Sequence, residues 1–457
     1  MIPRDVRTAE DMRRIVEERS ARNVTIALTD TNGLLRGKYV ICDKFLSALE
    51  GGWSMPPVVL AAHFDDVIYD APIIADGSDG YADTRTRLLP ETCREIPWED
   101  ATRNLLVLAE YDEEFEDICP RGIYRRIEKI AAEMGLQPYH ALEYEFTLFE
   151  ENAQTAFQKG YCDLTPATAL VTYEVIQRQA AWSDFYNELL DVFDRMDVQL
   201  ETAHEEMGPG FMEASLAPQA GVLAADNAVL FKTYTKAFAE RTGRLASFMA
   251  RWNNDADGQS GHVHISLKDL DGKPVFRDEA AADAMSDTMR HFLAGMQKLM
   301  PELLLMLGPN INSFKRWVPN IFAPIAATWG YENRTCALRV IRGSAKSQRI
   351  ECRTPGADAN PYLVLACLVG AGLFGIRHKL EPTAPMEGNV YEQEIPQDQR
   401  FPESFRDGIE AFRASQAARE LFGERFVETY AATRDQQDRE FRAKVTDQEL
   451  RRFFELA

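Results

Sequence analysis

Short segments in which apolar and polar residues alternate dominate the first part of the chain, and this pattern predicts β-strands. Two of them, "NVTIALTD" (23–30) and "LLRGKYVI" (34–41), are separated by "TNG", which indicates a hairpin turn. A third strand is predicted at "NLLVLAEYD" (104–112), and a short polar helix is predicted at 8–21. Residues 44–100 are rich in Pro, Gly and Asp and show no long helical period.

Beyond about residue 113, predicted strands and helices alternate to the end of the chain. Helices are expected at about 121–135, near 173–196 and in a C-terminal region after about 402. We place a domain boundary near residue 113, which divides the chain into residues 1–113 and 114–457.

The segment "LEYEFTLFE" (142–150) places two carboxylates inside an otherwise apolar stretch. Side chains alternate along a strand, so Glu143, Glu145 and Thr147 share one face while apolar residues take the other. Taken alone, this pattern favours a half-solvated strand over a metal site.

Two further segments, "GHVHISL" (261–267) and "RIECR" (349–353), repeat this design. Their polar residues again share one face: His262, His264 and Ser266 in the first segment, and Arg349, Glu351 and Arg353 in the second. One such strand could be a surface ladder of charges, and a lone histidine is usually structural. Three strands of this kind in one acidic chain indicate a shared polar interior.

The composition argues against two classes of partner. The chain has 457 residues, of which 45% are hydrophobic and 27% charged, and its net charge is −21. Such an acidic surface repels nucleic-acid phosphates and anionic lipids, so neither nucleic acid nor membrane is expected as a partner. The longest apolar run, "LVLACLVGAGLFGI" (363–376), is too short to span a bilayer and predicts a core or subunit-contact helix.

Cysteine usage and the N-terminal segment predict a cytoplasmic protein. The seven cysteines are scattered without a CxxC pair, which suits reduced thiols. The first twenty residues, "MIPRDVRTAEDMRRIVEERS", are charged and lack the apolar core of a signal peptide.

The segment "ETAHEEMGPGFME" (201–213) adds four glutamates and a histidine around a Gly-Pro-Gly turn. Carboxylate oxygens are the ligands that hard divalent cations prefer, and sites for Mg²⁺ or Mn²⁺ accept histidine. Arginines beside such a cluster suit phosphate oxygens, because the guanidinium is planar and permanently charged. There is no GxxxxGK[ST] loop. The residues alone therefore predict a metal-dependent enzyme that handles a nucleotide phosphate without a P-loop.

Six motifs follow one another in a familiar order: "EYEFTLF", "HEEMGPGFME", "GHVHISL", "NSFKRWVP", "NRTCALRV" and "RIECRTPGADANPYL". With these motifs the chain resembles the glutamine synthetase superfamily from about residue 23 to the C-terminus, and in particular its glutamate–amine ligase branch, which is similar to gamma-glutamylpolyamine synthetases. The resemblance implies an α+β fold, with an N-terminal β-grasp domain and a catalytic α/β domain that has a curved antiparallel sheet. It also implies homo-oligomeric rings, hexamers or dodecamers, with active sites between neighbouring subunits.

The activity that this resemblance implies is an ATP-dependent ligation. In the family, ATP phosphorylates the γ-carboxylate of glutamate, and an amine then displaces phosphate from γ-glutamyl phosphate to form an amide. The implied small-molecule partners are glutamate, an amine and ATP, together with two or more Mg²⁺ or Mn²⁺ ions per site.

Individual residues carry over through the motifs. The implied ligands are Glu145, Glu206 and Glu213 for the first metal, and Glu143, His262 and Glu351 for the second. The implied nucleotide-binding residues are Glu201, His264, Ser266, Arg339, Lys346 and Arg349. Arg334 and Arg353 match arginines that stabilise the transferring phosphoryl group, Arg316 and Arg353 match those that hold glutamate's carboxylates, and Gly258 matches a backbone contact to the amino acid. Glu206 is preferred to Glu205 because it keeps the family's register to the Pro-Gly turn.

The chain departs from the family pattern on the substrate side. "VPNIFAP" (318–324) has Phe322 where the family's glutamate closes the site and helps to deprotonate ammonium. Asp257 stands where an asparagine that contacts glutamate is common, and "GGWSMPP" (51–57) stands roughly where the family has an aspartate that reaches the neighbouring site. Tyr391 lies in a segment similar to one that is adenylylated in some bacterial members, and we interpret it as a turn residue without modification.

These departures leave several hypotheses open. The first is a ligase that makes a γ-glutamyl amide from an organic primary amine, either a monoamine with an apolar group or, as the nearest rival, a polyamine. The second is an ordinary glutamine synthetase that uses ammonia and has an unusual flap. A third, a relative that has lost catalysis, conflicts with the presence of all six matched metal ligands.

Overall fold

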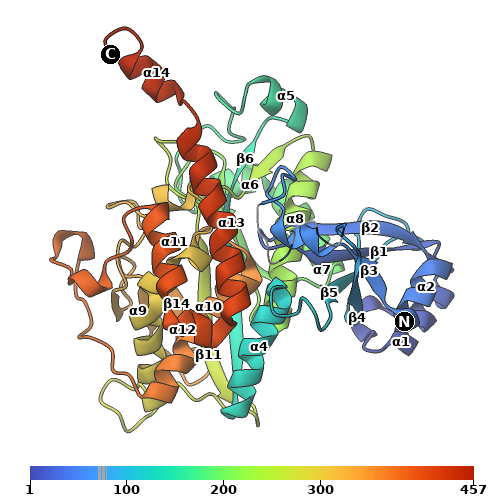
Figure 1. Ribbon diagram of the computed structural model, residues 1–457, viewed down its shortest axis with the longest axis horizontal. Coiled ribbons are helices and arrows are strands. Elements are labelled where there is room, and N and C mark those ends of the chain that lie inside the picture. The colour runs from blue at the N-terminus through green and yellow to red at the C-terminus, as the bar shows by residue number, and fades with distance from the viewer. Residues whose placement is uncertain (70–73, 75–77, 79) are drawn as a thin grey trace.

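The computed structural model describes the chain except for residues 70–73, 75–77 and 79. A smaller N-terminal part lies at the right of Figure 1, beside a larger body that holds most of the helices. A five-stranded sheet belongs to the N-terminal part and a curled nine-stranded sheet to the body, which confirms the predicted α+β fold.

The N-terminal sheet has the strand order β2-β1-β5-β4-β3. Strand β1 pairs in parallel with β5, and the other neighbours are antiparallel. The elements are α1 (Ala9–Glu18), β1 (Asn23–Thr29), β2 (Leu35–Ile41), α2 (Cys42–Gly51), β3 (Trp53–Met55), β4 (Thr84–Glu95) and β5 (Leu105–Tyr111). The first predicted helix and the three predicted strands are confirmed.

The predicted hairpin joins β1 to β2 and reaches the large body. Gly33 in its turn has a φ of 86°, a left-handed conformation that glycine adopts freely because it lacks a Cβ. The buried Asp30 carboxylate accepts hydrogen bonds from the backbone N–H groups of Asn32 and Leu34, each over 2.9 Å. From the large body, Asn360 Nδ2 donates to the backbone oxygen of Asp30 over 3.0 Å. The turn is therefore fixed both internally and against the body.

Helix α2 and strands β3 and β4 overlap residues 44–100 and were not predicted. Helix α2 is short and buries only Phe45 and Ala48, so its apolar period is weak. Strand β4 shifts its register against β5 between Leu89 and Arg94, which breaks the alternation of apolar and polar residues. The part of this region that comprises residues 70–73, 75–77 and 79 lies outside the described residues.

The large sheet has the order β12-β13-β14-β11-β6-β8-β7, and β9 and β10 also pair with β6. Its pairings are antiparallel except between β12 and β13, which agrees with the predicted antiparallel sheet. The strands are β6 (Leu136–Phe149), β7 (Leu200–Glu205), β8 (Phe211–Leu216), β9 (Gln219–Ala220), β10 (Leu245–Ser247), β11 (Gly261–Asp269), β12 (Trp329–Tyr331), β13 (Leu338–Ile341) and β14 (Arg349–Cys352). Strand β6 thus lies at the centre of the sheet.

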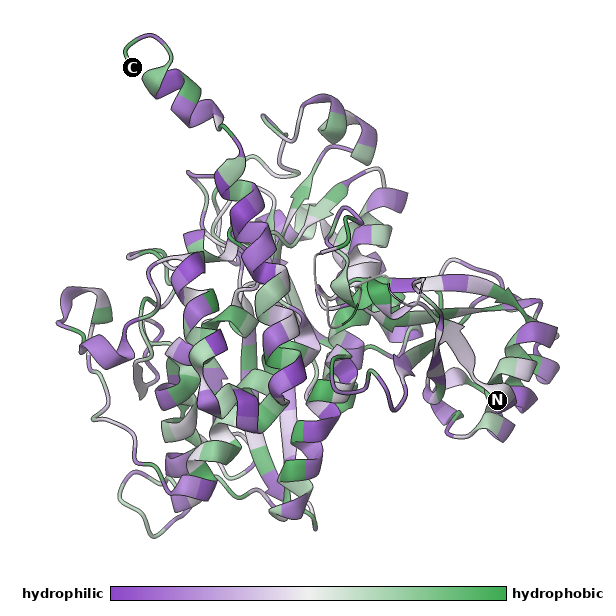
Figure 2. Cartoon of the chain, viewed as in Figure 1, coloured by the Kyte–Doolittle hydropathy of each residue, from purple (hydrophilic) through white to green (hydrophobic). Residues whose placement is uncertain are grey.

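Helices surround this sheet (Figure 1). They are α4 (Pro120–Glu133), α5 (Ala153–Gln158), α6 (Ile176–Ala181), α7 (Ser183–Arg195), α8 (Val222–Arg241), α9 (Asp287–Leu307), α10 (Pro361–His378), α11 (Phe405–Ala414), α12 (Gln416–Phe422), α13 (Glu424–Ala443) and α14 (Asp447–Phe453). Hydrophilic residues occupy much of the outward side of α11 and α13, as Figure 2 shows. The predicted helices at 121–135 and after 402 are confirmed, whereas the one near 173–196 is two helices, because the backbone leaves helical geometry at Trp182.

Helix α10 contains the apolar run at 363–376. It is long and apolar enough to cross a membrane, but 78% of its 18-residue window is buried inside the structure. It packs against α4, α8 and α9, so the prediction of a core helix is confirmed.

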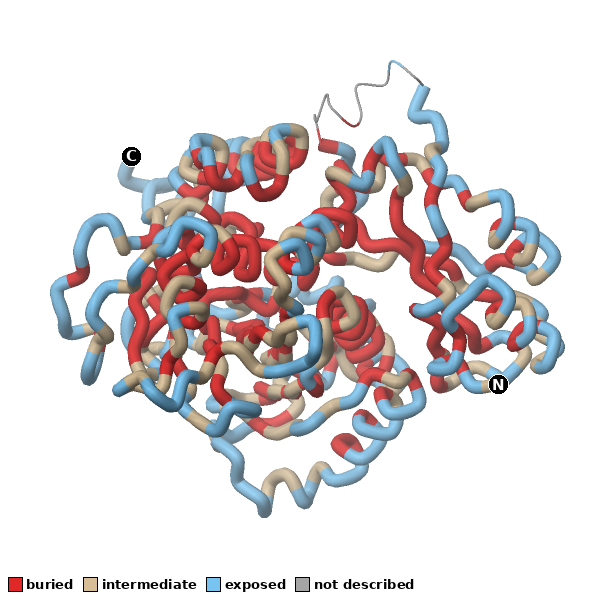
Figure 3. Tube along the Cα trace, turned by 90° about the horizontal axis from the view of Figure 1, so that it is seen from below, coloured by how far each residue is buried: buried red, intermediate tan, exposed pale blue. Residues whose placement is uncertain are grey.

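Three hydrophobic clusters occupy the interior of the described residues, and two of them are large. One extends from Val6 to Cys119, and the other fills the large body, where buried chain is red in Figure 3. Strand β5 belongs to both, because Val107 faces the first cluster and Leu106 and Leu108 face the second. The two sheets therefore share a packed junction, and a domain boundary after residue 113 stays a prediction.

Candidate active site

A cavity of about 1010 Å³ opens on the polar face of the large sheet. Nearly all predicted site residues line it: Glu143, Glu145, Glu201, Glu206, Glu213, Asp257, Gly258, His262, His264, Ser266, Phe322, Arg334, Arg339, Lys346, Arg349, Glu351 and Arg353. The shared polar interior that the three strand patterns predicted is therefore confirmed as an arrangement, while the role of each residue stays a prediction.

Strand pairing explains why these side chains meet. Glu143 on β6 lies opposite His262 on β11 and Ser215 on β8. Two residues further along β6, Glu145 lies opposite Glu213. Because residues two apart on a strand share a face, the same alternation that buries Tyr144 in the core aims both glutamates into the cavity.

Among the residues that the structure describes, three groups of side chains could each hold a cation. They are Glu143 with Glu213 and His262, Glu143 with His264 and Glu351, and His204 with Glu206 and Glu213, and within each group the ligand atoms lie within 4.8 Å of one another. Burial, followed by the charges of three neighbouring glutamates, raises the pKa of Glu213 to about 10. So many crowded carboxylates with imidazoles between them fit divalent cations such as Mg²⁺ or Mn²⁺.

His204 is a possible ligand to which the sequence analysis gave no role. It lies opposite Glu213 in the sheet, and its Nε2 is 3.2 Å from Glu206 Oε1. The signal was present, because His204 lies two residues before Glu206 in the segment 201–213, which was noted for its glutamates and histidine. Tyr173 and Glu174 also line the cavity, and they were missed because a helix was expected there.

Adjacent glutamates 205 and 206 have different surroundings. Glu206 lines the cavity, whereas Glu205 is buried elsewhere and accepts a hydrogen bond from Thr172 Oγ1 over 3.2 Å. Glu145 lines the cavity, and one of its carboxylate oxygens accepts a hydrogen bond from the backbone N–H of Ser260. The placement thus favours Glu206 over Glu205 as a cation ligand.

Glu351 is held between two arginines. Arg339 Nη1 donates to its Oε2 over 2.8 Å and Arg353 Nη1 to its Oε1 over 2.5 Å. Burial acts to raise the pKa of Glu351, but the charge of Arg353 and of two histidines outweighs burial and holds that pKa at about 2. Glu351 therefore stays ionised and orients both arginines along the cavity wall.

His264 connects the predicted metal and nucleotide residues. Arg349 Nε donates to its Nδ1 over 3.0 Å, so the ring proton is on Nε2, which lies 3.0 Å from Glu143 Oε1. The predicted nucleotide-binding residue His264 therefore also sits among cation-ligand side chains.

Two cations near the rim remain without carboxylate partners. Arg334 and Lys346 line the cavity and are exposed, and within the described part of the chain neither forms an ion pair. Uncompensated cations next to a carboxylate cluster suit the oxygens of a polyphosphate.

Arg316 is the exception among the predicted residues, because it does not line the cavity. Its buried guanidinium donates to the backbone oxygens of Thr354 over 2.9 Å and Arg353 over 3.1 Å. Burial lowers the pKa of Arg316 to about 10. In this structure the side chain braces the strand end that carries Arg353 and lies against Gly258 instead of facing a substrate carboxylate.

The segment at 318–324 forms an apolar part of the cavity wall. Ile321 and Phe322 line the cavity there, and Phe322 is 52% exposed. Phe322 has a φ of 54° and Asn320 a φ of 69°, left-handed conformations that are uncommon for these residues, especially the bulky phenylalanine. The hydroxyl of Tyr391 donates to the backbone oxygen of Ala323 over 2.9 Å and anchors the end of the segment.

The family model described as "Glutamine synthetase, catalytic domain" matches residues 117–453. The chain belongs to the glutamine synthetase family. It is therefore an ATP-dependent glutamate ligase that forms a C–N bond, of a family that uses divalent metal ions.

Several members of the glutamine synthetase family align over nearly the whole chain. Type-1 glutamine synthetase 2 of Dictyostelium discoideum is 36% identical over 438 residues, which cover 95% of this chain and 84% of that one. Gamma-glutamylethanolamide synthetase GlnA4 of Streptomyces coelicolor is 35% identical and covers 98% of this chain and 95% of its own. Glutamate–isopropylamine ligase of a Pseudomonas species is 30% identical and covers 97% of each chain.

Solved structures show the same fold. A GmaS/ADP complex has a TM-score of 0.84 and 22% sequence identity over 96% of this chain and 98% of that one. Apo GmaS without ligand has a TM-score of 0.83 over the same shares.

Proposed function

We propose that this glutamine synthetase family member joins glutamate to an organic primary amine, through γ-glutamyl phosphate, with release of ADP and phosphate. The observation that carries the proposal is the apolar cavity wall formed by Ile321 and Phe322. Two aligned relatives support it, because their names describe an ethanolamide synthetase and an isopropylamine ligase.

The carboxylate cluster would hold two or more Mg²⁺ or Mn²⁺ ions, with Glu145, Glu206 and Glu213 as one ligand set and Glu143, His262 and Glu351 as the other. Bound ions would neutralise phosphate oxygens and polarise the transferring group. The chain's own residues position the substrates around them. We assign Glu201, His264, Ser266, Arg339, Lys346 and Arg349 to ATP, and Asp257, Gly258, Arg316 and Phe322 to the substrates.

Arg334 and Arg353 would stabilise the phosphoryl group as it moves from ATP to glutamate. Both line the cavity, and Arg353 is fixed by its ion pair with Glu351. A guanidinium held beside the transferring phosphorus lowers the barrier by matching developing negative charge. Attack on the γ-phosphate predicts ADP and orthophosphate as products, and detection of AMP and pyrophosphate instead would refute this step.

The choice of amine follows from Phe322. Ammonium needs a negative charge for binding and a base for deprotonation, and a phenyl ring supplies neither. The exposed ring can bury substrate carbon, at about 25 cal/mol per Å² removed from water, and can face a cationic head at roughly 0.5–2 kcal/mol. Its exposure of 52% disfavours the alternative that Phe322 only packs the loop. A monoamine with an apolar group therefore fits better than ammonia or a polyamine.

We also propose an assembly and a cellular location for the protein. We infer a homo-oligomeric ring in the cytoplasm, with active sites between subunits. Helix α14 projects away from the body in Figure 1, and four apolar side chains on it or just after it are exposed: Leu450, Phe453, Phe454 and Leu456. An unsupported apolar arm of this kind suits contact with another copy of the chain.

An amine panel tests the function. With ATP and glutamate present, phosphate release is measured for ammonia, isopropylamine, benzylamine, ethanolamine and putrescine. We expect kcat/KM to be at least tenfold higher for isopropylamine or benzylamine than for ammonia. Phe322→Glu should shift the preference toward ammonia, whereas the control Phe322→Leu should keep it. Wild-type protein that uses ammonia faster than every organic amine would establish the ordinary synthetase instead.

A further inference from the structure

A second cavity, of about 750 Å³, lies between the N-terminal hairpin and the back of the catalytic sheet. Its walls come from segments that are distant in the sequence: the hairpin residues 32–36, helix α8, strand β10 with the residues after it, the loop 310–315 and the end of helix α13. The volume lies within the range of small-molecule sites, roughly 300–1,000 Å³. The cavity is therefore large enough for an organic molecule and is shaped by the packing of the two parts of the chain.

The charge of this cavity is opposite to that of the whole protein. Lys232, Lys236 and Lys315 line it, and within the described residues none of the three forms an ion pair. Asp358 is the only carboxylate among the described lining residues, and Asn310 and Ser313 already donate to it, over 2.8 Å and 2.7 Å. Apart from Asp358, whose charge acts on Lys232, the described wall thus gathers three lysines without an ion-pair partner, in a chain of net charge −21.

The other two basic groups in the wall have partners. Arg36 Nε pairs with Asp30 over 2.8 Å, and Arg36 also pairs with Asp66. His63 Nδ1 lies 2.9 Å from Asp65 Oδ1. Arg36 and His63 are thus paired with carboxylates of the N-terminal part of the chain. The three lysines are the basic groups of the described wall that lack an ion-pair partner.

Two of the lysines flank one aromatic ring. The ammonium of Lys232 lies 6.0 Å from the ring centroid of Phe248, and that of Lys236 lies 5.7 Å from it. Lys232 is only 7% exposed and donates to the backbone oxygen of Ala359 over 2.9 Å, which uses one of its three donors. Burial, assisted by the charge of Lys236, lowers the pKa of Lys232 to about 7. An ammonium in an apolar enclosure is stabilised by a nearby anion.

We propose that this cavity binds a small organic anion, a carboxylate or phosphate head on an apolar body. The head lies between Lys232 and Lys236, and the body packs against Phe248 and the neighbouring apolar wall, which includes Phe64 and Phe441. This site is separate from the active site, because Phe248 packs on Tyr144, on the face of β6 opposite to its glutamates. It does not rest on the identity of the amine.

A bound anion would contact the hairpin, α8, the loop 310–315 and α13 at the same time. The loop 310–315 continues directly into Arg316 and the apolar wall segment of the active site. Occupancy should therefore stabilise the whole protein and could adjust the position of that wall.

The test measures binding to the full-length protein by calorimetry in the presence of saturating ATP and glutamate. Octanoate and octyl phosphate are the anionic probes and octanamide is the neutral probe of the same length. We expect saturable binding of at least one anion, at least tenfold tighter than that of octanamide. The two anions separate a carboxylate preference from a phosphate preference, and either supports the site.

Variants locate the binding. Lys236→Glu should weaken anion binding at least tenfold, and so should Lys232→Met in protein that still unfolds cooperatively. Lys129→Glu, an exposed lysine of α4 that does not line the cavity, is the matched charge control and should bind as the wild type does. Equal binding of octanamide, unchanged binding by Lys236→Glu, loss of binding on saturation with ATP and glutamate, or no binding of either anion would each overturn the proposal.

Discussion

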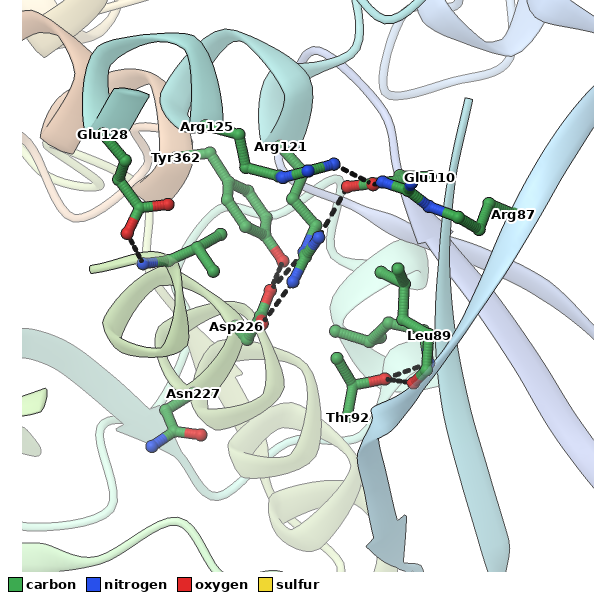
Figure 4. A network of polar contacts seen from close by, with 12 residues as sticks. Arg87, Leu89, Thr92, Glu110, Arg121, Arg125, Glu128, Asp226, Asn227 and Tyr362 are labelled. Carbon is green, nitrogen blue, oxygen red and sulfur yellow. Dashed lines mark hydrogen bonds and ion pairs between the residues drawn. The ribbon is translucent and has the colours of Figure 1, made fainter. Parts of the chain in front are cut away.

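Two regions of this protein bury glutamates, and they balance the negative charge in opposite ways. In the junction between the two sheets, Glu110 on β5 is 1% exposed and is contacted by Arg87, Arg121 and Arg125 (Figure 4). Arg121 and Arg125 each donate to it over 2.5 Å. Burial acts to raise the pKa of Glu110, but the arginines outweigh burial and lower it. This carboxylate is fully compensated by the chain itself.

The same network continues into the large body. Arg121 on α4 also forms a two-point contact with Asp226 on α8, over 3.0 Å and 3.2 Å. The hydroxyl of Tyr362 on α10 donates to Asp226 over 2.6 Å. The network therefore links the N-terminal sheet to three helices of the body, and arginines meet both of its buried carboxylates.

The active-site cavity holds the opposite arrangement. Burial, followed by the charges of Glu143, Glu145 and Glu206, raises the pKa of Glu213. Histidines and arginines lie around this cluster, and His204 Nε2 is 3.2 Å from Glu206 Oε1 and 3.7 Å from Glu213 Oε1. Buried glutamates thus stabilise the junction where arginines meet them, whereas in the cavity they meet one another and form groups that could hold a cation.

The largest expected effect is a loss of turnover when a carboxylate is removed from the active-site cavity. Glu213→Gln should lower kcat on the order of 100–1000-fold, because a phosphoryl group then lacks part of its charge stabilisation. The unfolding midpoint in metal-free buffer should not fall, since repulsion is relieved. Phosphate release and thermal unfolding measure the two quantities.

The matched control for Glu213→Gln is Glu205→Gln, at a buried glutamate outside the cavity. It should keep turnover near the wild-type value. A Glu213→Gln enzyme with turnover within threefold of the wild type would contradict the assignment of this cluster to catalysis.

Substitutions in the network around Glu110 should lower the stability of the folded protein. Glu110→Gln leaves three arginines facing a neutral amide, and breaking a buried ion pair by removing one partner costs about 3–5 kcal/mol. We expect the free energy of unfolding in urea to fall by this amount. Glu116→Gln, at an exposed glutamate near Arg125, is the control and should change it by less than about 1 kcal/mol. Equal effects of the two substitutions would show that the network contributes little.

Addition of a divalent cation should affect only the cavity. A ligand that binds the folded state alone adds about 2.7 kcal/mol at a concentration 100 times its Kd. Mg²⁺ or Mn²⁺ should therefore raise the unfolding free energy of the wild type and of Glu110→Gln alike. The gain should shrink in Glu213→Gln, and an undiminished gain there would place the ion elsewhere.

The smallest expected effect is a change in the stability contribution of Glu110 at low pH. The pKa of Glu110 is lower in the folded protein than its ordinary value of 4.5, so its contribution is complete above that pH and is lost as the pH falls through the folded value. The difference in unfolding free energy between wild type and Glu110→Gln should therefore shrink below about pH 4.5. A difference that stays constant down to pH 3 would show that the charge of Glu110 is not what the arginines require.

Local pattern predicted the parts of this structure that depend on alternation. The faces of β6, β11 and β14 could be assigned from sequence, because residues two apart point the same way whatever surrounds the strand. Helix α2 and strand β4 escaped, since one buries few residues and the other changes register. The motifs placed most candidate site residues in one cavity, although their chemical roles are still to be measured.

Features that depend on long-range packing could not be predicted in this way. Glu110 and Asp226 are 116 residues apart, and nothing near either residue signals that Arg121 bridges them. Arg316 was matched to a substrate contact by its motif, yet backbone oxygens of the segment at 353–354 hold its guanidinium. The surplus lysines of the second cavity likewise become visible only when five distant segments meet.

Strand β6 constrains how this protein can change over evolutionary time. Its alternate residues serve the cavity and the core, so inserting or deleting one residue within Leu136–Phe149 would turn Glu143 and Glu145 into the apolar interior. Substitutions there can be tried one at a time, but the length of the strand cannot drift. The wall segment at 318–324 lies outside the sheet, so substitutions there leave the alternation of β6 unchanged.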